Sequence, residues 1–485
     1  MNMRMDVTLG QMLAVEDDPA LQDFVCAETG ISLWTQVRIV YLEAMMSDLL
    51  YAGTLTGRAQ TRAAPMRAVT TLARSVARNA RFALTGADRA DICILGNGIA
   101  DERHGERWFN RLTDHFSQAD PDRSLVIADQ YDWRWAFPRE HERTLLHAPR
   151  QAWHVAVGRA LVRPHHRRRA QQLIDLVSAR ALDALGWSPG AARRLGMIER
   201  LAQKSASLPY KLRGYDAMLA RIAPRVLMVD AACYGPAAPL IAAARRRGIA
   251  TAEYQHGSMS GGHIAYNFAP ARLADAAFMS TLPEYFLSYG SWWSEQVNAP
   301  LHHWIVGNPH RSAKLEAEPE TREPQDSVLI LSDGIDFDRY LELARQLQPA
   351  AAGEGLRVRL RPHPLERALV RERHGADIGG IGIDTTPDMY ASLREAQAVV
   401  SEVSTGLFEA VGIVPRLYLW DTPKARFSFP SHPFDSFTTA GELAELLRQP
   451  GSGALRAQDS EAIWADDWRR RYAEFLDARQ VGVAR

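Results

Sequence analysis

The sequence predicts an α/β protein with two Rossmann-like domains that face a cleft, preceded by a helical N-terminal region. Three observations predict this fold class. From residue 90 onwards, short apolar runs that end in turn or polar residues alternate with helical patterns, as in βαβ units with a parallel sheet. An acidic stretch with two prolines at 312–326 divides these units into two groups. The chain of 485 residues is long enough for about two to four domains.

Residues 1–88 are predicted to be helical, because apolar residues in two segments recur at helical spacing. The first segment contains Leu33, Val37, Val40, Leu42 and Met45. The second sets Met66, Val69, Leu72 and Val76 on one side and Arg67, Arg74, Arg78 and Arg81 on other faces. This basic amphipathic segment either lies on an anionic membrane surface or packs its apolar side on the protein itself.

The first Rossmann-like domain is expected over residues 89–311. Its predicted strands are the apolar runs at 91–96, 124–128, 225–230, 249–254 and 304–306, and residues 140–222 carry a long helical pattern. Residues 312–326 are the predicted linker. The second domain is expected over 327–460, with strands at 328–331, 356–360, 398–400 and 417–420. Residues 461–485 are predicted to form a closing helix, because apolar residues recur there at i, i+4 spacing.

Composition excludes several classes of protein. The net charge is zero, the apolar content is 46% and the charged content 24%, which is typical of a globular protein and not of a nucleic-acid binder. Only four of the 57 basic side chains are lysines, and a bias towards arginine codons explains this without function. Cys26, Cys93 and Cys233 are scattered, so neither a zinc site nor a disulfide framework is expected.

The expected compartment follows from segments that the sequence lacks. The first ten residues contain no apolar core of a signal peptide. No run reaches the roughly 18 apolar residues that a membrane span needs. We therefore expect a cytoplasmic protein, with peripheral binding at the inner face of the cytoplasmic membrane as a further option.

Three polar clusters follow predicted strands of the second domain. They are Ser332–Gly334, Arg361–Pro364 and Ser401–Gly406. In an open α/β sheet the ligand binds at the carboxyl ends of the strands. Basic and hydroxyl groups gathered there predict a phosphate site, and hence a nucleotide site in the C-terminal third.

Each candidate for the donor site has a functional and a structural interpretation. Pro362 and Pro364 end the strand beside Arg361 and His363, which would neutralise a phosphate leaving group, or the segment is an ordinary turn. Ser401, Ser404 and Thr405 stand where a helix begins, so they would bind phosphate or simply cap the helix. Glu409, about one turn further on, would hold ribose hydroxyls.

Two residues compete for the role of general base. His256 ends a predicted strand of the first domain, and its reference pKa suits proton transfer near neutral pH. Asp333 ends the first strand of the second domain. His263 and Tyr266 are candidate acceptor contacts, although each is alternatively a core residue. Weaker acceptor candidates are Trp292, Trp293, His310 and the Asp129–Asp132 loop.

Several reaction types are disfavoured by missing motifs. The sequence contains no P-loop, no GxGxxG after a strand, no HExxH and no GxSxG. Asp336 and Asp338 form a short acidic pair that also suits the start of a helix. We therefore expect no metal and no cofactor.

The motifs resemble those of bacterial surface-polysaccharide transferases of GT-B architecture, and bacterial sialyltransferases above all. Ser332-Asp333-Gly334 is similar to their acid-acid-glycine motif, except that Ser332 replaces an acid; His363-Pro364 matches their His-Pro motif and Ser404-Thr405 their hydroxyl pair. The resemblance implies that Asp333 is the general base. It also implies that His363, Ser404 and Thr405 hold the phosphate of a departing CMP.

The chain is also similar to CDP-glycerol polyol-phosphate transferases. His256-Gly257 matches their His-Gly loop, which acts as the base, and Arg361 with His363 matches their donor pair. The two resemblances cover about residues 225–425. They imply a metal-independent reaction with a cytidine-linked donor.

The predicted function is an inverting glycosyltransferase. It would move a sugar from a nucleotide-sugar donor, CMP-linked in preference to CDP- or UDP-linked, to a glycan or lipid-linked glycan of a surface polysaccharide such as capsule, O-antigen or lipopolysaccharide. The alternatives are a CDP-polyol phosphotransferase, a nucleotide-sugar 2-epimerase of the same architecture, and a non-catalytic nucleotide-sugar-binding scaffold.

Overall fold

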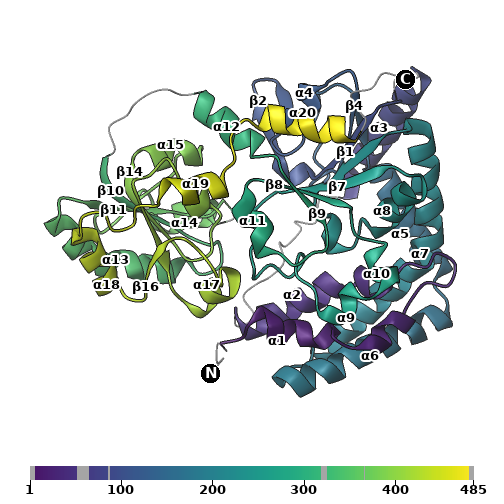
Figure 1. Cartoon of the computed structure of the whole chain (residues 1–485), viewed down its shortest axis with the longest axis horizontal. Coiled ribbons are helices and arrows are strands. Elements are labelled where there is room, and N and C mark those ends of the chain that lie inside the picture. Colours follow the sequence, from purple (N-terminus) through teal and green to yellow (C-terminus); the bar gives the residue numbers. More distant parts are fainter. Residues whose placement is uncertain (1–5, 52–64, 86–87, 318–324, 365, 480–485) are drawn as a thin grey trace.

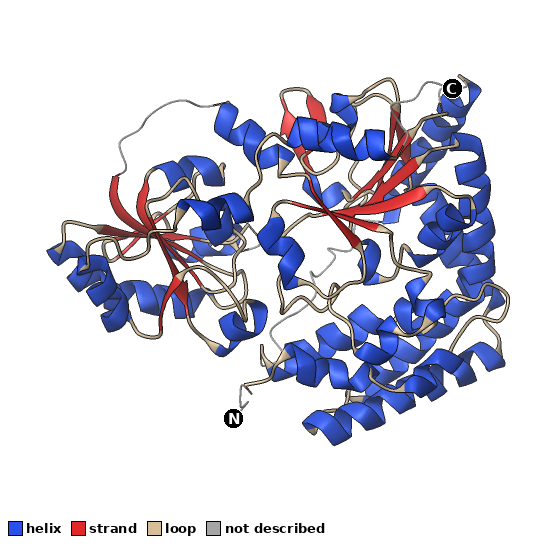
Figure 2. Ribbon diagram, in the orientation of Figure 1, coloured by secondary structure: helices blue, strands red, loops and turns tan. Residues whose placement is uncertain are grey.

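The protein contains two seven-stranded sheets, each the centre of one domain (Figures 1 and 2). The computed structural model describes residues 6–51, 65–85, 88–317, 325–364 and 366–479. We call the two parts the N-terminal and the C-terminal domain after their sheets. The predicted fold class is confirmed: two Rossmann-like domains in a GT-B arrangement, with helices before the first sheet.

The region before the first sheet is mostly helical where it is described. It contains α1 (Leu9–Leu13), α2 (Arg38–Leu49), α3 (Pro65–Leu84) and 3-10 helices at Ala14–Glu16, Pro19–Asp23 and Trp34–Gln36. The predicted helical region also includes 52–64, which lie outside the described residues. A buried ion pair of 2.6 Å joins Arg38 to Glu16, and Arg38 also donates to the carbonyls of Ile264 and Asn267. These bonds fix the first fifty residues to the N-terminal domain.

The sheet of the N-terminal domain has the strand order β5-β4-β1-β6-β7-β8-β9, and all its neighbours are parallel. The strands are β1 (Ile92–Gly96), β4 (Ser124–Ala128), β5 (Thr144–Leu146), β6 (Val226–Val229), β7 (Ala250–Tyr254), β8 (Tyr285–Ser288) and β9 (His302–Ile305). A separate hairpin pairs β2 (Asp101–His104) with β3 (Arg107–Asn110). The helices are α4 (Asp114–Ala119), α5 (Ala148–Leu161), α6 (Pro164–Leu185), α7 (Ala191–Ile222), α8 (Ala238–Arg246), α9 (Pro270–Leu273), α10 (Ala276–Met279), α11 (Ser291–Gln296) and α12 (Pro309–Glu316).

Continuous apolar runs form these strands because both faces of the sheet are covered. In β1, Ile92 and Ile94 belong to one buried cluster, whereas Cys93 and Leu95 belong to the cluster on the opposite face. Successive side chains of a strand point to opposite faces, so an alternating polar pattern would leave one core unfilled.

The sheet of the C-terminal domain has the order β12-β13-β11-β10-β14-β15-β16 and is parallel except at β12–β13. The strands are β10 (Gln325–Leu331), β11 (Arg357–Arg361), β12 (Asp377–Ile378), β13 (Ile381–Ile383), β14 (Ala396–Ser401), β15 (Arg416–Trp420) and β16 (Asp435–Phe437). The helices are α13 (Phe337–Gly353), α14 (Arg367–His374), α15 (Met389–Arg394), α16 (Gly406–Glu409), α17 (Pro423–Ser428) and α18 (Ala440–Arg448).

The last described segment returns to the N-terminal domain. Instead of one closing helix over 461–485, the structure has α19 (Ala457–Ile463) and α20 (Trp468–Ala478), separated at Asp467 by a left-handed backbone conformation with φ of 55°. Trp468 and Tyr472 pack on Phe116 of the N-terminal domain. Residues 480–485 lie outside the described part.

The structure corrects several element predictions. The strands β5, β8, β12, β13 and β16 were not predicted, and neither was the β2–β3 hairpin. Most of these strands have only three or four residues, too few for a clear pattern. The predicted linker 312–326 overlaps the end of α12 and the start of β10, and residues 318–324 lie outside the described residues.

The two domains touch through a loop of the N-terminal domain that follows β7. A Cβ atom on Gly262 would overlap the carbonyl oxygen of Phe427 in α17, and one on Gly261 would lie 2.9 Å from Pro430. The hydroxyl of Ser260 donates to the carbonyl of Ser428. Backbone therefore packs directly on backbone at this contact.

We expect Gly262→Ala to lower the free energy of unfolding by about 1–3 kcal/mol, because the added methyl group must push the loop off α17. Urea unfolding measures this change. Gly10→Ala is the control, since it lies in α1 with open space around its Cβ position. Equal stability of the two variants would contradict the close domain contact.

Candidate functional site

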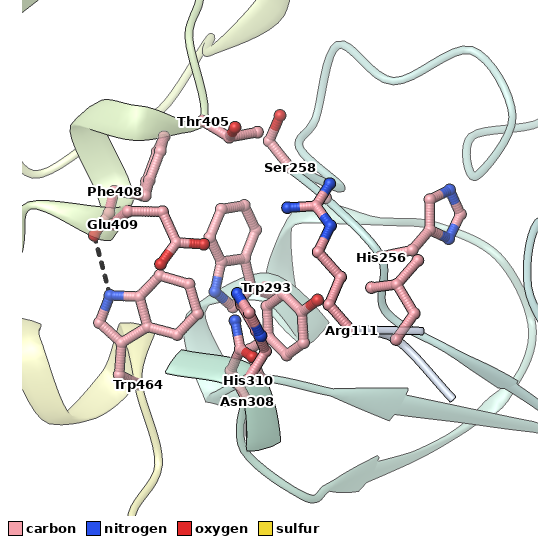
Figure 3. Close-up of a pocket in the computed structure, with 13 residues that line it drawn as sticks. Arg111, His256, Ser258, Trp293, Asn308, His310, Thr405, Phe408, Glu409 and Trp464 are labelled. Atoms are coloured by element: carbon pink, nitrogen blue, oxygen red, sulfur yellow. Dashed lines mark hydrogen bonds between the residues drawn. The ribbon is translucent and has the colours of Figure 1, made fainter. Parts of the chain in front are cut away.

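A pocket of about 80 Å³ lies between the two domains and is lined by residues from both (Figure 3). The N-terminal domain contributes Arg111, Leu112, His256, Gly257, Ser258, Tyr289, Trp293, Asn308 and His310; the C-terminal domain contributes Thr405, Phe408 and Glu409; the returning segment contributes Trp464. We call this the interdomain pocket. Of the ten predicted site residues, it brings together His256, Thr405 and Glu409.

His256 follows β7 and is positioned by its neighbour Gln255. The Gln255 backbone N–H donates to the carbonyl of Leu287, and its side-chain oxygen accepts from the N–H of Tyr289, at 2.9 and 2.8 Å. The imidazole Nδ1 is buried and has no hydrogen-bond partner in the described part of the chain. Burial lowers the pKa of His256 to about 4, against the opposing effect of a hydrogen bond with the Tyr254 backbone, so the ring is neutral at neutral pH.

Glu409 ends the short helix α16 and supplies a carboxylate to the pocket. The hydroxyl of Tyr390 donates to one of its oxygens. Burial raises the pKa of Glu409, and the positive charges of Arg311 and Arg111 oppose this shift. Arg311 is itself fixed by donating to the carbonyl of Val411 and by lying 4.9 Å from the ring of Trp464.

Arg111 is the exposed cation of the pocket. Its guanidinium points towards Ser258 and Thr405 (Figure 3). It forms no ion pair within the described residues. Sequence analysis missed Arg111 because it follows the β2–β3 hairpin, which was not recognised. Asn308, which caps α12 by accepting from the Arg311 N–H, and Tyr289 were missed as well.

In the turn before α16, backbone N–H groups form hydrogen bonds with side chains of the same turn. Ser401 Oγ accepts from the N–H of Ser404, and Ser404 Oγ accepts from the N–H of Gly406, both at 3.1 Å. The backbone N–H groups of Ser404 and Gly406 therefore already have acceptors at this helix start. Only Thr405 of the three predicted hydroxyl residues lines the pocket.

Arg361 and His363 do not line the interdomain pocket. Arg361 is buried, and its Nη1 donates to Asp384, to the carbonyl of Thr386 and to Ser392 at 2.7–2.9 Å. Its Nη2 is buried with no partner among the described residues. The His363 N–H donates to Ser332 and Glu366, while Gly334 leaves room for its ring, because a Cβ there would lie 2.7 Å from Nδ1.

Asp333 belongs to a buried ion network of the C-terminal domain. Lys424 Nζ lies 2.6 Å from Asp333 and 2.7 Å from Glu402, and Asp333 also accepts from the N–H groups of Ile335 and Asp336. Burial alone would raise the pKa of Asp333, but Lys424 and these hydrogen bonds hold it below the usual range. The carboxylate of Asp333 is therefore held in place as the partner of Lys424.

A second pocket, of about 230 Å³, shares the lining residue Ser258 with the interdomain pocket and is also lined by Tyr234 and His263. His263 Nδ1 accepts from the N–H of Ala265 at 3.2 Å, so its Nε2 carries the proton and faces the Tyr234 hydroxyl at 3.1 Å. Tyr266 is instead fully buried and donates to Glu253, whose pKa burial raises to about 7.

A larger cavity, of about 930 Å³, lies at the carboxyl ends of β1, β4 and β6. We call it the N-domain cavity. Its walls are largely apolar and come from α5, α7 and α8, for example Ala152, Val155 and Leu240. Tyr234 lines both this cavity and the second pocket.

Charged groups of both signs line the N-domain cavity. Asp129 and Asp230 stand at the strand ends, and Lys204 and Lys211 stand on α7. Asp129 lies 2.5 Å from His147, which also meets the Tyr215 hydroxyl at 3.0 Å. Burial raises the pKa of Asp230 well above its usual range, and burial lowers that of Lys211 to about 8. The cavity therefore suits a large ligand with an apolar body and polar groups.

No protein-family model matches the chain, and no curated protein matches it in sequence. Several solved structures are similar in overall arrangement. The UDP-GlcNAc 2-epimerase of Methanocaldococcus jannaschii has a TM-score of 0.45 at 10% identity, covering 80% of this chain and 99% of that chain. CalG4, the calicheamicin glycosyltransferase, has a TM-score of 0.41 at 12% identity, covering 82% and 100%.

The wall teichoic acid polymerase TagF has a TM-score of 0.38 at 11% identity, covering 86% of this chain and 94% of that chain. At such identities and TM-scores, these neighbours carry no information about the substrate of this chain. Its fold rests on the two sheet orders given above.

We expect Lys424→Met to lower the free energy of unfolding by about 3–5 kcal/mol, because it leaves Asp333 and Glu402 buried without their cation. Lys314→Met is the matched control. Its ion pair with Asp388, at 3.1 Å, is about one-third exposed, and such pairs contribute about 0–1 kcal/mol. Urea unfolding of both variants measures the difference, and similar losses would contradict a structural role for the Lys424 network.

Proposed function

We propose that the protein is a nucleotide-sugar-dependent transferase of GT-B architecture. The donor nucleotide binds in the interdomain pocket and the acceptor binds in the N-domain cavity. One observation carries this proposal: three spaces lie in series, the first two sharing the lining residue Ser258 and the last two sharing Tyr234. A transferase needs two substrates side by side, whereas an epimerase needs room for only one.

Three side chains of the interdomain pocket suit a nucleotide. Glu409 offers carboxylate oxygens to ribose hydroxyls. Arg111 and Thr405 point into one space, where a guanidinium and a hydroxyl bind phosphate oxygens. The pocket of about 80 Å³ is smaller than the roughly 300–1,000 Å³ of most ligand sites, so donor binding requires the two domains to separate.

His256 is the better placed of the two candidate bases. It lines the interdomain pocket, and its ring lies 6.0 Å from that of Tyr234, which lines the acceptor side. Its unpaired Nδ1 is free to take a proton. Asp333 is bonded to Lys424 and lines neither the interdomain pocket nor the N-domain cavity, so we assign it to stability.

The proposed step is a direct displacement. The acceptor hydroxyl gives its proton to His256 while its oxygen forms a bond to the anomeric carbon of the donor. The bond from that carbon to the phosphate oxygen breaks, and the nucleotide leaves with the electron pair. Arg111 and Thr405 stabilise the charge on the departing phosphate, and holding both substrates in line supplies much of the acceleration.

The donor and the acceptor are proposed in finer detail from sequence. The resemblance to enzymes that use cytidine nucleotides favours a CMP-linked sugar, ahead of CDP- and UDP-linked donors. The same resemblance favours a surface polysaccharide or lipopolysaccharide as the acceptor. The size and apolar walls of the N-domain cavity agree with a bulky acceptor.

We expect one nucleotide among CMP, CDP, UDP, GDP and dTDP to raise the melting temperature, because a ligand that binds only the folded state stabilises it by about 2.7 kcal/mol at 100 times its Kd. The shift should vanish in Glu409→Gln and Arg111→Ala and persist in the surface variant Glu461→Gln. A panel without any shift, or a shift indifferent to both pocket variants, would remove the donor site from the interdomain pocket.

Turnover then separates the candidate activities. The nucleotide sugar that carries the identified nucleotide is incubated with and without a glycan acceptor. A transferase gives sugar transfer only with acceptor. Epimerised nucleotide sugar without acceptor would establish the 2-epimerase, and binding without turnover under either condition would establish the scaffold.

We expect His256→Gln to lower kcat/KM by about 10²–10⁴-fold, the usual contribution of a general base, without loss of the nucleotide-induced melting shift. His363→Gln is the comparison and should change kcat/KM little. If the order of the two variants were reversed, His363 would be the catalytic histidine.

The pH profile gives an independent check on His256. The pKa of the His256 imidazole in the free protein is about 4, against about 6.5 for an ordinary histidine. The neutral imidazole therefore predominates at all higher pH values. We expect kcat/KM to stay level from neutral pH down to about 5 and to fall as the pH approaches 4. A fall centred near 6.5 would contradict the burial of the His256 ring.

A further inference from the structure

The helix α3 is docked on the protein by its polar side. Thr71 and Ser75 are buried, whereas Met66, Val69 and Val76 are 74%, 64% and 52% exposed and Leu84 is 88% exposed. An amphipathic helix that packs on the core of its own protein normally buries its apolar side instead. One apolar residue of α3, Phe82, does pack against the main core. The apolar surface of the helix is therefore buried only in part.

Specific bonds fix α3 in this orientation. Asn79 donates to the carbonyl of Leu146 in β5 at 2.8 Å and accepts from the N–H of the same residue at 2.9 Å. The Thr71 hydroxyl donates to the carbonyl of Trp133 at 2.9 Å. The guanidinium of Arg78 lies 4.0 Å from the ring centre of Phe137. Rotating the helix to bury its apolar side would break all of these contacts.

The exposed side of α3 carries an excess of positive charge, although Arg67 pairs with Asp132 at 3.8 Å. The helix contains four arginines and no acidic residue. It packs against α5, which also lacks acidic residues and exposes Trp153 and Val155. Figure 1 shows both helices on the side of the N-terminal domain away from the C-terminal domain. We call this surface, made by α3 and the exposed residues of α5, the α3–α5 face.

We infer that the α3–α5 face binds the surface of an anionic lipid bilayer. Apolar side chains beside arginines form the pattern of a helix that lies in the membrane interface, with apolar groups among the acyl chains and arginines at the lipid phosphates. A second copy of the chain is a poor occupant, because a symmetric contact would set arginines against arginines. Among the described helices, none has the length and apolar character to cross a bilayer.

The position of the N-domain cavity agrees with this docking. Val155 of α5, the helix that packs against α3, lines the cavity and is half exposed. Membrane binding itself does not depend on the proposed transferase activity.

Flotation of the full chain with vesicles tests the inference. We expect the protein to float with phosphatidylcholine vesicles that contain about one-third phosphatidylglycerol and not with phosphatidylcholine alone. Raising the salt concentration should lower the bound fraction several-fold, because exposed charges are screened. Val69→Glu alone and Val76→Glu alone should each abolish flotation. The double variant Arg67→Glu with Arg74→Glu should reduce flotation several-fold.

Leu182→Glu is the matched control. Leu182 lies on α6 and is 56% exposed, so its replacement adds the same charge outside the α3–α5 face and should leave flotation unchanged. Melting temperatures of all variants establish that they are folded; position 69 is exposed, so its variant should melt like the wild type.

Wild-type protein that stays with the unbound fraction would overturn the inference, and so would equal flotation of Val69→Glu. A dimer that Val69→Glu converts to a monomer, without vesicle binding, would assign the face to a second copy.

Discussion

The contact of one loop with α17, together with the packing of Trp293 on Phe408, determines where the two sheets meet. This loop begins at His256 and ends near His263, and at Gly262 it leaves no space for a side chain against the Phe427 carbonyl. Because parallel strands direct all their carboxyl ends to one edge, this contact brings the polar edges of both sheets together. The interdomain pocket and the second pocket lie on either side of Ser258 in the same loop.

The fold could be predicted because each strand can be recognised from a short stretch of sequence. Strands such as β1 and β10 are buried on both faces, so each appears as an apolar run that any reader of the sequence can find. The site was predictable only in part. His256, Thr405 and Glu409 line the interdomain pocket, since their places at strand ends and in a short helix follow from that local pattern.

Arg361 and Asp333 do not line the interdomain pocket, because partners distant in sequence hold their side chains. Arg361 is bonded to Asp384 and Ser392, and Asp333 is bonded to Lys424, 91 positions further along the chain. A single sequence gives no sign of such pairing. The scarcity of lysine was a weak indication of where partly buried charges lie. Three of the four lysines line the N-domain cavity or belong to the buried ion network, namely Lys204, Lys211 and Lys424. An ammonium group is more compact than a guanidinium and fits such places.

The return of α20 to the N-terminal domain has a consequence for biosynthesis. Trp468, Tyr472 and Phe475 belong to the same buried cluster as Ile92 and Val226. On the ribosome, domains usually fold in the order in which they emerge. Here the domain that emerges first lacks part of its aromatic core until residues 468–478 have been translated. The C-terminal domain can therefore complete its own core earlier, although it is synthesised later, and the nascent N-terminal domain exposes apolar surface to chaperones throughout that interval.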